Sequence, residues 1–151
     1  MDTQIKKTTD TVAALNIAKK NPHYFNPYGL KAMEKDFKTG FLIGAYHENI
    51  MVGFVAFKEL NDQTVELKWL AIEPKYQNQG TGTLLVNEGV TLLPKKYAIC
   101  EMKTLSEIDP DLQYARTRKF YKKLEFIPLE TISPYPDWGK DNPCQIFVKI
   151  L

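Results

Sequence analysis

The stretch LAIEPKYQNQGTGTLL, residues 70–85, decides the fold of this chain. A strand-like run ends near Glu73, a glutamine-rich turn follows, and Gly80 and Gly82 alternate with threonine where a helical pattern begins. The unpaired N–H groups in the first turn of a helix, together with the positive end of its dipole, attract a phosphate group. Glycine lets a bulky pyrophosphate approach the backbone closely. The stretch therefore predicts an anion site between a strand and a helix.

Two other phosphate-binding loops do not fit these residues. A P-loop requires a Lys-Ser or Lys-Thr pair after its glycines, and this segment has neither. A dinucleotide-binding fingerprint that starts at Gly80 requires a third glycine where Leu85 stands. The residues themselves exclude both loops.

Hydrophobic periodicity on either side of this stretch predicts alternating strands and helices without internal repeats. Before it, we expect a strand at 3–7, a helix at 11–20 capped by Asp10, a short helix at 31–37, and strands at 41–47, 50–60 and 64–73. After the turn, we expect a helix at 81–93, a strand at 96–104, a helix at 112–124, and strands at 126–132 and 145–151. This order predicts a mixed sheet with helices on its faces.

Length and composition narrow the class of protein. The chain has 151 residues, which fits one domain spanning 1–151, and its 44% hydrophobic and 25% charged residues are typical of a globular protein. No apolar run approaches the roughly 18 to 20 residues of a membrane helix, and no signal peptide is apparent, so we expect a cytoplasmic protein without membrane contact. The net charge of +2 includes no concentrated basic patch, which argues against nucleic-acid binding. Cys100 and Cys144 lack metal-ligand spacing, so we predict no metal site and two buried, reduced thiols.

A second phrase, FYKKLEF at residues 120–126, lies at the end of the helix predicted at 112–124. This phrase and the pattern Gln77-x-x-Gly80-x-Gly82 resemble two motifs of the GNAT superfamily of acetyl-CoA-dependent N-acetyltransferases, in the family's order and on its element types. The resemblance covers residues 40–130 well, the first forty residues in element order only, and the last twenty hardly at all. It implies the GNAT fold, an α/β (α+β) architecture with a mixed, mostly antiparallel sheet of about seven strands flanked by about four helices.

The resemblance implies acetyl-CoA as the acyl donor. The backbone of Leu70 and Ile72 would pair with the pantetheine arm as if it were an added strand. Backbone amides of the turn would hold the pyrophosphate, and Gln77 would brace the turn. The cofactor-binding residues implied in this way are Leu70, Ala71, Ile72, Gln77, Asn78, Gln79, Gly80, Thr81, Gly82 and Thr83. The alternative is that the glycines only permit a tight strand-to-helix turn.

Acyl transfer to an amine requires a base for the amine and a proton donor for the departing thiolate. Tyr121 resembles the tyrosine that donates a proton to the CoA sulfur in many GNAT enzymes, and a phenol with a pKa of about 10 stays protonated at neutral pH. Glu66 lies six residues before Ile72 and resembles the general base of the histone-acetyltransferase branch. The alternatives are a packing role for Tyr121 and a solvated strand position for Glu66.

Three residues depart from the family pattern in the second phrase and its helix. Glu125 replaces a glycine, Thr117 replaces a common alanine, and Tyr114 replaces an asparagine that can help to hold the cofactor. The same helix carries both arginines of the chain, Arg116 and Arg118. Arginine binds phosphate with two parallel hydrogen bonds, so these residues serve either phosphate or ordinary surface ion pairs.

The acceptor is less well defined than the donor. We expect a primary amine of a small molecule, such as a polyamine, an amino sugar or an amino-acid derivative. Two alternatives remain. One is a protein lysine or N-terminal acetyltransferase, which the resemblance of Glu66 to a histone-acetyltransferase base favours; the other is a catalytically silent acyl-CoA-binding module. The irregular loop at 133–143 either shapes the acceptor pocket or covers an edge of the sheet. By analogy with relatives that pair through their C-terminal strands, we also expect that a homodimer can form.

Overall fold

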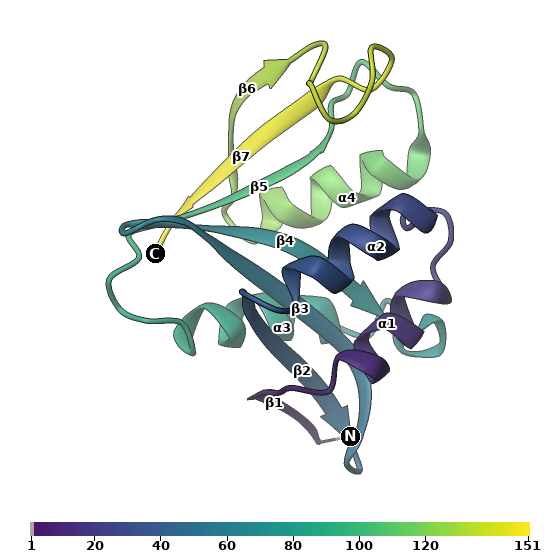
Figure 1. Ribbon diagram of the computed structural model, residues 1–151, viewed down its shortest axis with the longest axis vertical. Coiled ribbons are helices and arrows are strands. Elements are labelled where there is room, and N and C mark those ends of the chain that lie inside the picture. The colour runs from purple at the N-terminus through teal and green to yellow at the C-terminus, as the bar shows by residue number, and fades with distance from the viewer. Residues whose placement is uncertain (1) are drawn as a thin grey trace.

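The computed structural model describes residues 2–151, in which seven strands form one sheet in the order β1-β2-β3-β4-β5-β7-β6 (Figure 1). The strands are β1 (Thr3–Lys7), β2 (Phe41–His47), β3 (Ile50–Asn61), β4 (Thr64–Ile72), β5 (Ile99–Leu105), β6 (Ile127–Ile132) and β7 (Cys144–Ile150). The helices are α1 (Thr11–Lys19), α2 (Pro27–Asp36), α3 (Thr81–Thr91) and α4 (Leu112–Lys123), with a short 3₁₀ turn at Pro74–Tyr76. Among the described strands, neighbours pair antiparallel except for β4 and β5, which are parallel. The predicted fold class and element order are confirmed.

Local sequence signals explain most element boundaries. The Asp10 side chain accepts a hydrogen bond from the Ala13 N–H at 3.0 Å and caps α1 as predicted. The prediction for the second helix was wrong at its start, because α2 begins at Pro27 rather than at residue 31. Asn26 accepts from the Gly29 N–H at 2.8 Å, and proline is well suited to the first helical position, where its missing N–H is not needed. The remaining boundaries lie within three residues of the prediction.

Two hydrophobic clusters pack the helices onto opposite faces of the sheet (Figure 1). The first joins α3 and α4 to the sheet through fully buried residues such as Leu85 and Val86. The second joins α1 and α2 to the other face through Ile17 and Met33. No helix in residues 2–151 is both long enough and apolar enough to cross a membrane.

The feature that positions the functional site is the separation of β4 from β5. The two strands pair only where Thr64–Glu66 of β4 meets Ile99–Glu101 of β5. Beyond this short ladder they diverge, as Figure 1 shows, and β4 from residue 67 and β5 from residue 102 have no strand between them. We call this region the fork, and the Glu66–Glu101 pair its apex. Because α3 follows β4 and α4 follows β5, both helices start beyond the open end of the fork.

Candidate active site

The segment between β4 and α3, which we call the cofactor turn (residues 77–83), exposes backbone donors at the start of a helix. Asn78 and Gly80 have positive φ angles of 62° and 85°, and a Cβ on Gly80 would have no atom within 4 Å. The Leu84 N–H makes the first bond of α3, to the Gly80 carbonyl at 3.0 Å. The N–H groups of residues 81–83 precede that bond and have no acceptor within the helix. This geometry suits an anion such as a pyrophosphate.

Gly82 brings the two sequence motifs into direct contact. A Cβ at this position would lie 3.2 Å and 3.4 Å from two carbons of the Phe120 ring. Phe120 belongs to the FYKKLEF phrase on α4, so that phrase packs against the first turn of α3. A side chain at residue 82 would have to displace this ring.

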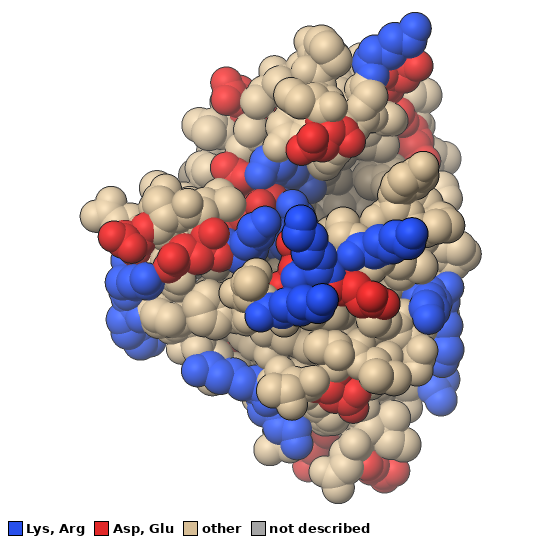
Figure 2. Space-filling model, in the orientation of Figure 1, with Lys and Arg blue, Asp and Glu red and all other residues tan. Residues whose placement is uncertain are grey.

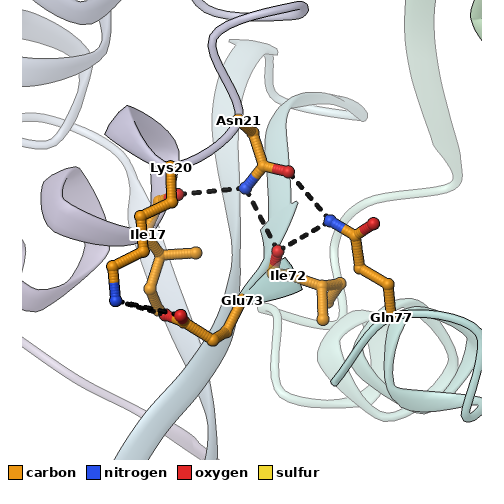
Figure 3. A network of polar contacts seen from close by, with 6 residues as sticks. All are labelled: Ile17, Lys20, Asn21, Ile72, Glu73 and Gln77. Atoms are coloured by element: carbon orange, nitrogen blue, oxygen red, sulfur yellow. Dashed lines mark hydrogen bonds and ion pairs between the residues drawn. The ribbon is translucent and has the colours of Figure 1, made fainter. Parts of the chain in front are cut away.

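Gln77 braces the cofactor turn through its side-chain amide (Figure 3). The amide nitrogen donates to the Ile72 carbonyl at 3.0 Å and to the Asn21 side-chain oxygen at 2.8 Å. Asn21 in turn donates to the carbonyls of Ile72 (3.1 Å) and Ile17 (3.0 Å). A Lys20–Glu73 ion pair at 2.9 Å lies beside this network. The turn is therefore fixed to the end of β4 and to the end of α1 together.

The open edge of β4 presents the backbone groups of Leu70 and Ile72 to the fork. The Glu73 N–H donates to the Val52 carbonyl of β3, and backbone groups of an antiparallel ladder alternate in direction. Ala71 therefore directs its N–H and carbonyl toward β3, whereas Leu70 and Ile72 direct theirs away from it. The Ile72 carbonyl already accepts from Asn21 and Gln77. Of the three predicted strand residues, Leu70 has the backbone groups best placed to pair with an extended ligand.

A buried charge cluster lies at the apex of the fork. Glu66 is 4% exposed, and its carboxylate lies 3.0 Å from the Lys103 ammonium. Lys103 also forms an ion pair with Glu101, its second neighbour along β5. Burial alone would lower the pKa of Lys103, but the hydrogen bond to Glu101 and the charge of Glu66 outweigh it and raise this pKa. Lys103 is therefore held as a cation between two carboxylates.

This cluster faces the side of the sheet that α1 and α2 cover. Val65 and Leu67, the neighbours of Glu66, point into the core beneath α3 and α4, and side chains of a strand alternate between faces. Figure 2 shows several basic side chains (Lys or Arg) with fewer acidic ones near the middle of the face with α1 and α2.

Tyr135 of the irregular loop 133–143 lies near the same cluster. Burial raises the pKa of Tyr135, the charge of Lys103 lowers it, and the charge of Glu66 raises it. The Tyr135 ring packs on Trp138 of the same loop, with 5.3 Å between ring centroids. Because the charges of Lys103 and Glu66 act on Tyr135, the loop lies on the same side of the sheet as the cluster.

Tyr121 is buried on the opposite face of the sheet, in the cluster beneath α3 and α4. Its ring packs edge-to-face on Phe120 and Phe126 at centroid distances of 5.0 Å and 5.3 Å. Burial raises the pKa of Tyr121, and the nearby Cys100 thiol adds to the shift. Cys100 pairs with Val65 just before the apex, so Tyr121 lies near the apex level. Its phenol keeps its proton, as a proton donor must.

Sequence reasoning missed Lys103 and an aromatic contact across the open end of the fork. His23 bonds to the Asp111 carboxylate at 3.1 Å, and the Tyr24 hydroxyl donates to the Gln113 carbonyl at 3.2 Å. Tyr24 also packs on Tyr114 with 5.3 Å between centroids. The segment after α1 thereby joins the end of β4 to the start of α4. Their spacing of two residues places Glu101 and Lys103 on the same face of a strand, which the sequence could have shown. Nothing in the sequence linked them to Glu66.

Within residues 2–151, no three His, Cys, Asp or Glu side chains gather as a set that could hold a metal ion. Cys100 and Cys144 are free and buried. Burial raises the pKa of Cys100 to about 12 and that of Cys144 to about 11.

Comparison with known proteins identifies related folds. Residues 11–126 match the model of the acetyltransferase (GNAT) family. A GNAT-family protein from Desulfovibrio desulfuricans has a TM-score of 0.84 at 16% identity, with 99% of each chain covered. A GNAT acetyltransferase from Elizabethkingia anophelis with bound acetyl-CoA has a TM-score of 0.75 at 18% identity, covering 99% of this chain and 98% of that one. An aminoglycoside 6'-N-acetyltransferase complexed with coenzyme A has a TM-score of 0.76 at 16% identity, covering 97% and 96%. No curated protein matches the sequence significantly.

Proposed function

Because the chain belongs to the GNAT family of acetyltransferases, we propose that it moves an acetyl group from acetyl-CoA directly to a primary amine of a small molecule. One observation carries this proposal: Glu66 and Tyr121 lie near the apex of the fork on opposite faces of the sheet. A direct transfer needs a proton acceptor on the side of the amine and a proton donor on the side of the sulfur. In this proposal Glu66 is the acceptor and Tyr121 is the donor.

The cofactor turn and the edge of β4 would hold acetyl-CoA. The N–H groups of residues 81–83 would receive the pyrophosphate, with Asn78 and Gly80 giving the turn its shape and Gln79 bonded back to the Lys75 carbonyl. Leu70 would pair with the pantetheine arm along the open edge of β4. Acetyl-CoA supplies the thioester whose acetyl group is transferred.

The side chains at the apex would move the protons. Glu66 would accept a proton from the amine, directly or through a water molecule, and Lys103 would hold the Glu66 carboxylate in place. Tyr121 would donate its phenolic proton to the departing sulfur. These two steps leave a neutral amide and a protonated thiol.

A small acceptor is supported by the burial of Glu66. With 4% of Glu66 exposed and Lys103 3.0 Å from its carboxylate, only a slender amine can reach that carboxylate. The net charge of Glu66, Glu101 and Lys103 is negative, which favours a cationic acceptor. A lysine side chain of a protein is also slender, so a protein acceptor is the second candidate.

A panel of amines tests the proposal. Polyamines, amino sugars, amino-acid derivatives and lysine-containing peptides are each incubated with acetyl-CoA, and acetylated products are identified by mass spectrometry. We expect turnover with at least one small amine and little with the peptides. Turnover of the peptides alone would establish the protein acceptor. CoA binding without turnover of any amine would indicate a catalytically silent module.

A further inference from the structure

Arg118 on α4 has an unusual environment for an arginine. It is half-buried, and its Nη1 donates to the carbonyl oxygen of Leu105, the last residue of β5, at 2.7 Å. None of the ion pairs within residues 2–151 involves Arg118. A guanidinium has five N–H donors, so most of them remain available to a ligand. The ordinary surface ion pair considered from the sequence does not describe this residue.

The Leu105 carbonyl points into the fork. The Ser106 N–H donates to the Pro143 carbonyl at 3.0 Å, so Ser106 directs its backbone groups toward β7. The Ile99 N–H donates instead to the Gln63 carbonyl, on the side of β4. Because directions alternate along β5, Leu105 follows Ile99 and faces the side of β4. The Arg118 guanidinium, bonded to that carbonyl, therefore lies at the β5 side of the fork.

The guanidinium is also close to the level of Leu70. Glu66 pairs with Glu101 at the apex, and four residues further along each strand lie Leu70 and Leu105. Both strands run in the same direction, but a bulge between Leu67 and Trp69 takes up one residue of β4, so Leu70 lies about one residue below the height of Leu105. A ligand strand along Leu70 would have β4 on one side and Arg118 on the other.

The helix geometry directs Arg118 away from the cofactor turn. Phe120 contacts Gly82 in that turn, and residues 118 and 120 are about 200° apart around a helix with 3.6 residues per turn. Arg118 is thus better placed for the middle of the cofactor than for its pyrophosphate. The helix geometry therefore favours an amide carbonyl of the pantetheine arm over the pyrophosphate as the group that Arg118 binds.

Resting on the cofactor placement proposed above, we propose that Arg118 is a cofactor-positioning residue that donates a hydrogen bond to an amide carbonyl of the pantetheine arm. The arm would then be held on both edges, by the β4 backbone and by this guanidinium. Many relatives have an asparagine at the position of Tyr114, and its side-chain amide can help to hold the cofactor. Tyr114 has no amide, so Arg118 would supply this polar contact to the cofactor instead.

Two ligands and two variants test this role. Arg118→Gln removes the guanidinium, and the matched control Arg116→Gln removes the same charge from an exposed position on the same helix. CoA binding is measured by calorimetry, and S-acetylpantetheine binding, which lacks the phosphates, by NMR titration. A lost charge-assisted hydrogen bond should weaken both ligands by the same factor, about tenfold to a hundredfold, in Arg118→Gln only.

Each other outcome has a definite meaning. A loss for CoA alone would show a phosphate contact, and equal losses in both variants would show a general charge effect; either overturns the proposal, as does unchanged binding. If Arg118→Gln does not fold, the contact is tested on the wild-type protein through the NMR signal of the Arg118 side chain. The chain has only two arginines, so Arg116→Gln assigns the Arg118 side-chain N–H signal. That signal should shift when S-acetylpantetheine is added, and a static signal refutes the contact. Failure of the wild-type protein to bind CoA would instead refute the proposed function.

Discussion

The cofactor turn and the fork apex are built in opposite ways. The turn is exposed except at Thr81 and Gly82, comes from consecutive residues, and offers backbone N–H groups whose donor capacity does not depend on side chains. The apex is buried and depends on side chains of Glu66, Lys103 and Tyr121, which come from three different elements. Because the two regions share no residue, CoA binding and acetyl transfer should respond to different substitutions. Changes in the turn should alter the affinity for CoA, and changes at the apex should alter turnover.

The largest effect is expected at Tyr121. Tyr121→Phe keeps the buried ring and removes only the proton donor, so turnover with the true acceptor should fall by about 10²–10⁴. The dissociation constant for acetyl-CoA should barely change, because the hydroxyl acts mainly when charge builds on the sulfur. Steady-state kinetics and calorimetry on the same preparation measure both. Turnover equal to wild type would make Tyr121 a packing residue.

On the turn, Gly82→Asp should weaken CoA binding on the order of a hundredfold, since a carboxylate would repel the pyrophosphate at the start of α3. The new side chain would also press on the Phe120 ring, 3.2 Å from the added Cβ. Gly82→Ala is the control, because it keeps the steric contact and lacks the charge. Calorimetry on folded variants measures the difference. Equal affinities for wild type and Gly82→Asp would place the pyrophosphate elsewhere.

Glu66→Gln should lower turnover by about tenfold to a hundredfold and shift or remove the acidic limb of the pH–rate profile. The glutamine keeps the shape of the side chain, and Lys103 retains Glu101 as a partner. Glu101→Gln is the matched control: it removes the other carboxylate and should leave the acidic limb in place. An unaltered rate and profile in Glu66→Gln would mean that solvent or another residue takes the proton.

The smallest effect is expected at Gln77. Gln77→Ala removes two hydrogen bonds, one to the Ile72 carbonyl, which keeps Asn21 as a donor, and one to the Asn21 side-chain oxygen. Both bonds shape the turn without reaching CoA, so we expect a cost near that of one hydrogen bond, about 0.5–1.5 kcal/mol, and a roughly two- to tenfold fall in CoA affinity with turnover at saturation unchanged. Gln79→Ala, which removes a bond to the Lys75 carbonyl in the same exposed segment, is the comparison. A larger loss of CoA affinity in Gln79→Ala than in Gln77→Ala would show that Gln79, and not Gln77, is the residue that stabilises the turn.

The fold could be predicted from the sequence wherever the signal is local. Asp10 caps α1, Glu48 and Asn49 form the tight turn between β2 and β3 with positive φ angles, and the glycines open α3, because each depends on residues within a few positions of one another. The early start of α2 was also encoded, in Asn26 followed by Pro27, but the apolar pattern that was used begins later.

The candidate site could be predicted only in part. Its motif residues were identified by resemblance, but the ion pair between Glu66 and Lys103 joins residues 37 positions apart, and the Gln77–Asn21 bond joins residues 56 apart. Such pairs depend on how β4 separates from β5 and where the segment after α1 lies, which no local pattern specifies. For the same reason, burial of Glu66 could not be distinguished from a solvated strand position.

The two buried cysteines make the reaction easy to follow. A chromogenic disulfide reagent reacts with thiolates. Cys100 and Cys144 are buried and have pKa values of about 12 and 11, so they should not react with it at neutral pH. Coenzyme A released in solution has no such protection. The colour developed by an untreated sample would therefore count catalytic events, and a burst of two equivalents of protein thiol would signal denaturation during the measurement.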